Sequence, residues 1–173
     1  MDDQAKKDLY DNLSTLTVDD LRLDDLYQSL LAYEQGMIKI VHPDPLRHTA
    51  SSILDVVENE DRVIKIEQYE KFSQRLFDVC RDLGRAFGHR GPVTCHVFIS
   101  PAGGQSFPEH TDPDDVFLFM LKGKKHVRVN TVEVTLCTGD DLFIRHDTPH
   151  EVFTEEASVM LSFGLERFIV EKL

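Results

Sequence analysis

The sequence is poor in cysteine, poor in positive charge and free of long hydrophobic runs. Its three cysteines, Cys80, Cys95 and Cys137, are odd in number, widely spaced and without a Cys-x-x-Cys pair, which indicates reduced thiols in the core of a cytoplasmic protein. The 19 lysines and arginines stand against 31 aspartates and glutamates, and the net charge of −12 argues against direct binding to nucleic acid or to an anionic membrane. No apolar run approaches the ~20 residues that a membrane span requires. The acidic start, Met1–Asp3, lacks the apolar core of a signal peptide.

The first half of the chain, residues 1–90, has a mostly helical pattern. Apolar side chains recur there at helical spacing, and this predicts helices at about 23–35, 46–57 and 69–87. Residues 37–41 have the pattern of a short apolar strand. The polar and acidic residues 1–20 are expected to form a short helix or a loosely attached arm.

From Gly91 onward, short apolar runs alternate with turn residues, the pattern of an antiparallel sandwich or barrel. The expected strands cover residues 93–100, 115–121, 124–130, 132–136, 141–145, 150–154 and 157–164, with 166–171 as a further candidate. About eight short strands over this length fit a jelly roll, also called a double-stranded β-helix. No linker separates the halves, so residues 1–173 are expected to form one α+β, mainly β, domain. Residues 91–173 would form its jelly-roll core, and the N-terminal helices would pack on one outer face.

Three residues of the second half offer ligands for a metal ion. His110 and Asp112 are one residue apart, so on an extended strand their side chains share one face, and His150 begins a later strand pattern. Two imidazoles and one carboxylate cover one face of an octahedral metal and leave other positions open, as in non-haem Fe(II) oxygenases. His146 beside the same turn is the alternative to His150, which is preferred because it begins a strand. The other histidines lack a carboxylate at ligand spacing and are interpreted as surface or packing residues: His42, His48, His89, His96 and His126.

Lys125 is predicted to be a buried cation. It shares one face of its strand with Val127, and the apolar Val127 indicates that this face is interior. A buried ammonium is costly without a partner, and no acidic residue stands at a matching position on this strand. A ligand carboxylate is therefore the expected partner, such as the free end of a 2-oxoacid that chelates iron through its other end. Arg128 and Arg145 are the next candidates for this role.

Several segments carry a family resemblance. The run Cys95–Asp112, the segment 123–129 and the segment 139–144 leading to Pro149–Glu151 resemble the JmjC-type ribosomal oxygenases. These cupin-like enzymes use Fe(II) and 2-oxoglutarate to hydroxylate histidine or arginine side chains of ribosomal proteins. The similarity is dense over residues 91–164 and weaker over residues 20–60.

The resemblance implies roles for single residues. By it, His110, Asp112 and His150 are iron ligands, Lys125 binds the C5 carboxylate of 2-oxoglutarate, and Ser162 places a hydroxyl near the cosubstrate. Two positions depart from the family pattern: Phe98 replaces a frequent tyrosine that helps to hold the cosubstrate, and His96 stands where asparagine is common.

These observations predict an Fe(II)- and 2-oxoglutarate-dependent oxygenase that uses dioxygen to hydroxylate its substrate. The alternatives are a metal-dependent cupin enzyme that needs no 2-oxoacid, and a non-catalytic cupin that binds a small molecule. Acidic residues near the metal ligands in the sequence either belong to a solvated acidic surface or attract the substrate. In the second case the substrate would be a basic side chain, arginine, lysine or histidine, in a protein, a peptide or a free amino acid. The acidic residues are Glu109, Asp114, Asp115, Asp140, Asp141, Asp147 and Glu151.

Overall fold

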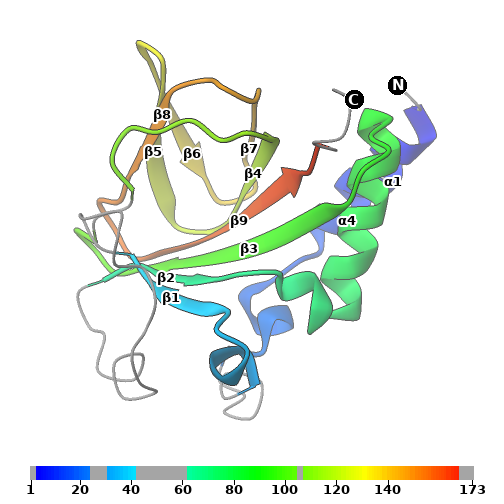
Figure 1. Ribbon diagram of the computed structural model, residues 1–173, viewed down its shortest axis with the longest axis horizontal. Coiled ribbons are helices and arrows are strands. Elements are labelled where there is room, and N and C mark those ends of the chain that lie inside the picture. The colour runs from blue at the N-terminus through cyan, green and yellow to red at the C-terminus, as the bar shows by residue number, and fades with distance from the viewer. Residues whose placement is uncertain (1–2, 24–30, 42–61, 105–106, 168–173) are drawn as a thin grey trace, which may run out of the picture.

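The computed structural model describes residues 3–23, 31–41, 62–104 and 107–167, and it shows two antiparallel β-sheets with helices beside the larger one (Figure 1). The larger sheet contains, in spatial order, β1 (Ile38–Ile40), β2 (Ile64–Ile66), β3 (Val93–Ser100), β9 (Ser158–Leu165), β4 (Asp115–Lys122) and β7 (Asp141–Ile144). The smaller sheet contains β6 (Val132–Cys137), β5 (Lys124–Val129) and β8 (His150–Phe153). This two-sheet sandwich confirms the predicted jelly roll with a mainly β architecture.

The strands predicted for the second half are confirmed to within one residue at each end. The further candidate at 166–171 is not supported where it can be followed, because Glu166 and Arg167 lie outside any strand. Residues 168–171 lie outside the described part of the chain.

Strand β4 shows why its sequence is a continuous apolar run. Val116, Leu118 and Met120 join the apolar cluster between the two sheets, whereas Phe117 and Phe119 join the cluster on the outer face. A strand that is covered on both faces needs apolar residues at every position. The outer cluster also contains the buried residues of the helices, which confirms that the helices cover one outer face of the roll.

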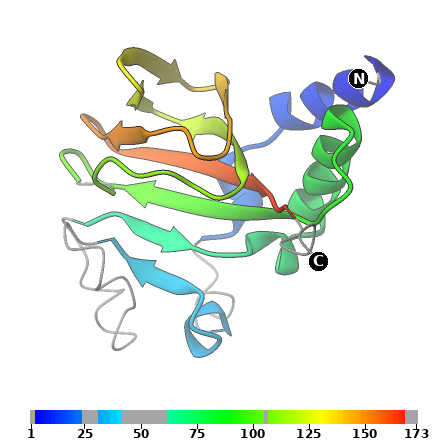
Figure 2. The ribbon, with the colours of Figure 1, turned by 45° about the horizontal axis from the view of Figure 1, so that its top comes forward.

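The N-terminal residues belong to this helical layer. Helix α1 (Asp3–Ser14) lies beside α4 (Gln74–Phe87) at one end of the larger sheet (Figure 2), and η1 (Val18–Leu21) follows it. Leu9 is fully buried, and the amide of Asn12 donates a hydrogen bond of 2.8 Å to the Asp82 carboxylate of α4. The first residues therefore form the helix that was one of the two expected outcomes, and α1 packs into the core.

The long helix predicted over 69–87 is divided in two. A 3₁₀ turn, η2 (Tyr69–Lys71), precedes α4, and Ser73 between them caps α4 by accepting a hydrogen bond of 3.3 Å from the Leu76 N–H. An extended N-cap residue cannot continue a helix, which explains the break. Gly88, at φ 64°, ends α4 in the left-handed conformation that glycine adopts without strain.

Strand β2 was not predicted. It pairs with β1 on one side and with β3 on the other, and so widens the larger sheet by two short strands. The predicted helix at 46–57 lies outside the described residues, as does most of the helix predicted at 23–35, of which residues 31–34 are helical.

Two of the three cysteines are buried as expected. Cys80 and Cys95 lie in the outer apolar cluster, but Cys137 is exposed, so its placement in the core was wrong. Cys137 ends edge strand β6, where its side chain faces away from the inter-sheet core. None of the helices in the described ranges combines the length and the apolar character needed to cross a membrane.

Candidate metal centre

Backbone pairing brings His110, Asp112 and His150 together. His150 opens β8, and its backbone exchanges two hydrogen bonds with His110, at 3.0 and 2.9 Å. The Asp147 N–H donates a 2.8 Å bond to the Asp112 carbonyl and ties the two loops together a second time. His110 and Asp112 were expected on one face of a strand. The structure places them instead in the loop before β4, where His110 forms only an isolated bridge.

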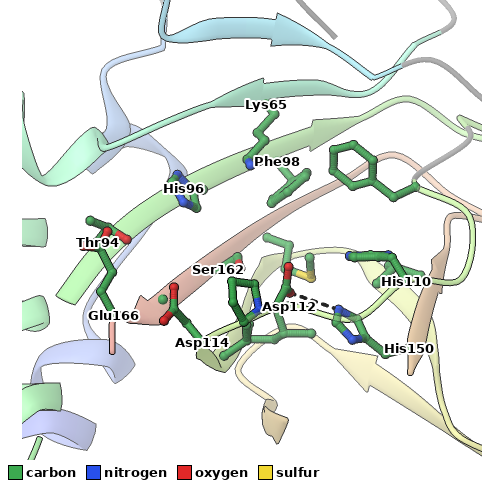
Figure 3. A pocket seen from close by; sticks show the side chains of 17 residues that line it. Lys65, Thr94, His96, Phe98, His110, Asp112, Asp114, His150, Ser162 and Glu166 are labelled. Atoms are coloured by element: carbon green, nitrogen blue, oxygen red, sulfur yellow. Dashed lines mark ion pairs between the residues drawn. The ribbon is translucent and has the colours of Figure 1, made fainter. Parts of the chain in front are cut away.

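The three side chains converge on one point (Figure 3). One potential ligand atom from each residue lies within 4.8 Å of the other two. His150 Nε2 is 3.4 Å from Asp112 Oδ2, and the two imidazole rings have centroids 4.4 Å apart. His150 is buried, whereas the other two side chains are partly exposed.

Both histidines are oriented as metal ligands require. Nδ1 of His110 lies 2.8 Å from the Pro108 carbonyl, and Nδ1 of His150 lies 3.0 Å from the Thr148 carbonyl. A carbonyl only accepts, so each Nδ1 carries the proton and each Nε2 lone pair is available to a cation. Two neutral imidazoles and one carboxylate fit a divalent metal of the iron type.

The electrostatics of the centre also favour a cation. Burial raises the pKa of Asp112, but contact with His150, the positive charge that His110 and His150 carry when they are protonated, and the charge of Lys65 together lower that pKa. Burial lowers the pKa of His150, and the Asp112 carboxylate and the Thr148 carbonyl together raise it above its usual value. The carboxylate therefore stays ionised and stabilises positive charge between the three residues.

His146, the alternative ligand, is turned away from this point. Its Nδ1 lies 2.7 Å from Asp115 Oδ1, and its backbone N–H donates to the same oxygen at 2.8 Å. The geometry therefore groups His150, not His146, with His110 and Asp112.

A cavity of about 180 Å³ opens beside the three residues. Ser162 lines it, as does Phe98, so both lie where a bound ligand could reach them. Phe107 forms a second aromatic wall, with its ring edge-on to Phe98 at 6.3 Å and to His110 at 5.5 Å between centroids. These rings form an apolar part of the cavity wall next to His110.

Lys125 is buried as predicted but is not among the residues that line the cavity. It is fully buried between the sheets with Val127, and its Nζ donates a hydrogen bond of 2.7 Å to Ser100 Oγ. Burial lowers the pKa of Lys125 to about 7. The two arginines named as substitutes are engaged or exposed: Arg128 pairs with Glu151, and Arg145 is exposed.

The acidic residues near the ligands in sequence mostly have other partners. Of the seven, Asp114 lines the cavity. Asp115 holds His146, Glu151 holds Arg128, and Asp140 accepts a 2.8 Å bond from the Cys137 N–H. Of the acidic residues expected near the ligands, Asp114 lines the cavity, together with Glu166, which follows β9.

Three of the ionisable residues that line the cavity were not predicted as site residues: Lys65, His96 and Glu166. His96 was interpreted as a packing residue. Two signals were available. The resemblance marks His96 as a departure from the family pattern, and His96 lies on the same face of β3 as Phe98, two residues further along.

Comparisons with known proteins agree with this architecture. A cupin domain model matches residues 96–163. Ribosomal oxygenase 2 of Bos taurus is 28% identical over 142 residues, which cover 70% of this chain and 30% of that protein. The bifunctional lysine-specific demethylase and histidyl-hydroxylase NO66 of Branchiostoma floridae is 26% identical over 122 residues, 69% of this chain and 19% of that protein.

A solved structure has the same fold. The ribosomal oxygenase YcfD from Escherichia coli, in complex with cobalt and 2-oxoglutarate, superposes with a TM-score of 0.66 at 19% identity, over 83% of this chain and 44% of that one. The chain thus carries a cupin domain and is distantly homologous to ribosomal oxygenases. It spans less than a third of the length of the two curated relatives.

Proposed function

We propose that this protein is an Fe(II)- and 2-oxoglutarate-dependent oxygenase that hydroxylates a basic side chain. The cupin domain and its distant homology to ribosomal oxygenases support this proposal. The observation that carries the proposal is the group His110, Asp112 and His150, with both Nε2 atoms available beside a cavity. These three residues would hold the iron. When bound, the iron supplies dioxygen activation at the positions that the protein leaves open.

The chain's own residues would position the two organic ligands. Lys125 would pair with the distal carboxylate of 2-oxoglutarate, because its ammonium is fully buried and has a hydroxyl, not a carboxylate, as hydrogen-bond partner. Ser162 would donate its hydroxyl to a ligand in the cavity that it lines. Phe98 and Phe107 would exclude water from the reacting carbon.

The basic nature of the substrate is supported by the cavity's acidic end. Asp114 and Glu166 line the cavity, and Figure 3 shows both on the side away from His110 and His150. A guanidinium, ammonium or imidazolium group would be attracted to this end, and the hydrogen to be replaced would lie toward the metal ligands.

The test is turnover by the purified protein with Fe(II), 2-oxoglutarate and ascorbate. Basic amino acids and basic peptides are supplied, succinate is measured, and mass spectrometry detects an oxygen added to the substrate. We expect both products with the parent protein and neither with His110→Ala. Metal binding without any succinate would contradict the proposal and favour the alternative, a metal-binding cupin that uses no 2-oxoacid.

A further inference from the structure

A positively charged wall stands on the β2–β3 side of the cavity. Lys65 of β2 and His96 of β3 both line the cavity, and Figure 3 shows them on the side opposite Asp114. The Lys65 Nζ lies 5.7 Å from the ring centroid of Phe98 and 5.8 Å from that of Phe107. Both distances are in the range of a cation–π contact, so the two rings help to hold the ammonium in the cavity wall.

This wall has an excess of positive charge. Glu67 pairs with two lysines, Lys39 at 2.6 Å and Lys65 at 3.0 Å, so two ammonium groups share one carboxylate. The three residues therefore carry a net charge of +1 in a chain whose total is −12. An ammonium has three N–H donors, and the contact with Glu67 leaves Lys65 with the capacity to bind a second anion.

His96 presents a donor of fixed orientation beside this charge. The backbone N–H of Gln68 donates to His96 Nδ1 at 3.2 Å, so Nδ1 is the acceptor and the ring proton is on Nε2. Burial, followed by the charge of Lys65, lowers the pKa of His96 to about 4, so the ring stays neutral at physiological pH. His96 is thus a neutral N–H donor in the cavity wall, next to an ammonium.

We propose that Lys65 and His96 bind a carboxylate of the substrate, so that the substrate is a free basic amino acid rather than an internal residue of a protein. This inference rests on the proposed function and narrows its substrate class. In an internal residue of a protein, the α-carboxyl group is part of a neutral amide. A free basic amino acid has an α-carboxylate that Lys65 can bind, and a basic side chain that Asp114 and Glu166 can attract. Lys65 lines the cavity and is 18% exposed, whereas Lys125 is fully buried, so the exposed lysine is assigned to the substrate and the buried one to the cosubstrate.

The test compares amino acids with their carboxamides. L-Arginine, L-lysine and L-histidine, and the corresponding amides, are titrated calorimetrically into the protein loaded with Mn(II) and 2-oxoglutarate. We expect at least one acid to bind about ten- to a hundredfold more tightly than its amide, the range for a charge-assisted hydrogen bond. The net charge of −12 would favour the more cationic amide, so overall charge cannot produce this preference.

Single substitutions test whether Lys65 and His96 cause the preference for the acid over its amide. Lys65→Met should reduce it to within about twofold and Lys65→Arg should restore it. His96→Phe should reduce it in part and leave the affinity for 2-oxoglutarate unchanged. Lys39→Met is the matched control, because it removes the other partner of Glu67 without changing a residue that lines the cavity. The preference should persist in Lys39→Met.

Several results would overturn the inference: equal binding of acids and amides, no binding of any of the three acids, or an equal loss in Lys39→Met and Lys65→Met. Weaker 2-oxoglutarate binding in Lys65→Met with unchanged amino-acid binding would also overturn it, since Lys65 would then serve the cosubstrate. Failure of the proposed function is distinguishable, because it appears as absent 2-oxoglutarate binding and absent succinate in the parent protein.

Discussion

Replacing Lys125 with methionine should stabilise the ligand-free protein while weakening its cosubstrate binding. Burial lowers the pKa of Lys125 from its usual 10.5 to about 7. At ~1.4 kcal/mol for each tenfold change in proton affinity, this corresponds to ~5 kcal/mol of destabilisation by the lysine at low pH. Methionine is of similar length and apolar, but it leaves the Ser100 hydroxyl without its donor, at a cost of ~1–3 kcal/mol. The expected net rise in the free energy of unfolding is therefore ~2–4 kcal/mol at pH 7.

The pH dependence gives this prediction a second signature. Between pH 7 and pH 10.5 the unfolded chain keeps a proton on Lys125 that the folded chain has lost, so the parent gains stability as the pH rises. The cost of the lysine is fully present below pH 7 and declines above it. The advantage of Lys125→Met over the parent should therefore shrink by ~2 kcal/mol between pH 7 and pH 9.

Urea unfolding followed by circular dichroism, at pH 7 and pH 9, measures both quantities. Lys124→Met is the control, because Lys124 is 36% exposed and its pairing with Glu155 at 3.6 Å contributes little. Its stability should change by less than about 0.5 kcal/mol at either pH. A Lys125→Met variant that is less stable than the parent, or whose advantage does not depend on pH, would show that Lys125 is not a desolvated cation.

Three further outcomes follow from the site and the fold. Lys125→Met should raise the dissociation constant of 2-oxoglutarate, measured by calorimetry, about ten- to a hundredfold. In the parent protein the affinity for 2-oxoglutarate should fall as the pH rises above 7, because the carboxylate binds the protonated lysine. Unchanged binding in Lys125→Met would show that the cosubstrate binds elsewhere. Asp112→Ala should abolish Mn(II) binding by electron paramagnetic resonance, whereas His146→Ala should retain it because His146 pairs with Asp115; retained binding in Asp112→Ala would refute the ligand assignment. Ser73→Ala should lower the free energy of unfolding by ~1 kcal/mol, because it removes the cap of α4, and an unchanged urea midpoint would contradict this role.

The candidate ligands could be identified from the sequence because metal binding restricts them to few residue types. His110 and Asp112 are close in sequence, so their proximity follows from local geometry alone. The choice of His150 over His146 was harder, because both flank one turn. It depends on which strand pairs with His110, and the two backbone hydrogen bonds between His110 and His150 are a non-local feature. Only the prediction that His150 begins a strand favoured the histidine that the structure groups with His110 and Asp112.

The burial of Lys125 could be predicted because alternation along a strand is a strong constraint. A shift of one residue would move Val127 into solvent, so the interior face was defined by that apolar residue. The partner of Lys125 could not be predicted. Ser100 lies on the other sheet, and the contact between them depends on how the two sheets pack.

The positively charged wall depends on β2, which was missed for a physical reason. A strand of three residues carries too little alternation to be distinguished from the start of a helix, and its stability comes from pairing with β1 and β3. The same pairing places Lys65 opposite Phe98 in the β2–β3 register. Neither the lysine nor its neighbours suggested a site before the sheet was known.

The acidic residues near the ligands show why proximity in sequence is a poor guide to the field inside a cavity. Asp115 holds the His146 backbone and ring, and Glu151 neutralises Arg128 across the β5–β8 strand pair. A count of acidic residues along the sequence would assign these charges to the cavity, but each is already paired with a nearby group. The field within the cavity is set instead by residues distant in sequence, with Lys65 on one side and Glu166 on the other. A cavity with charges of both signs favours a ligand that also carries both, and this distinguishes a free amino acid from a side chain within a protein.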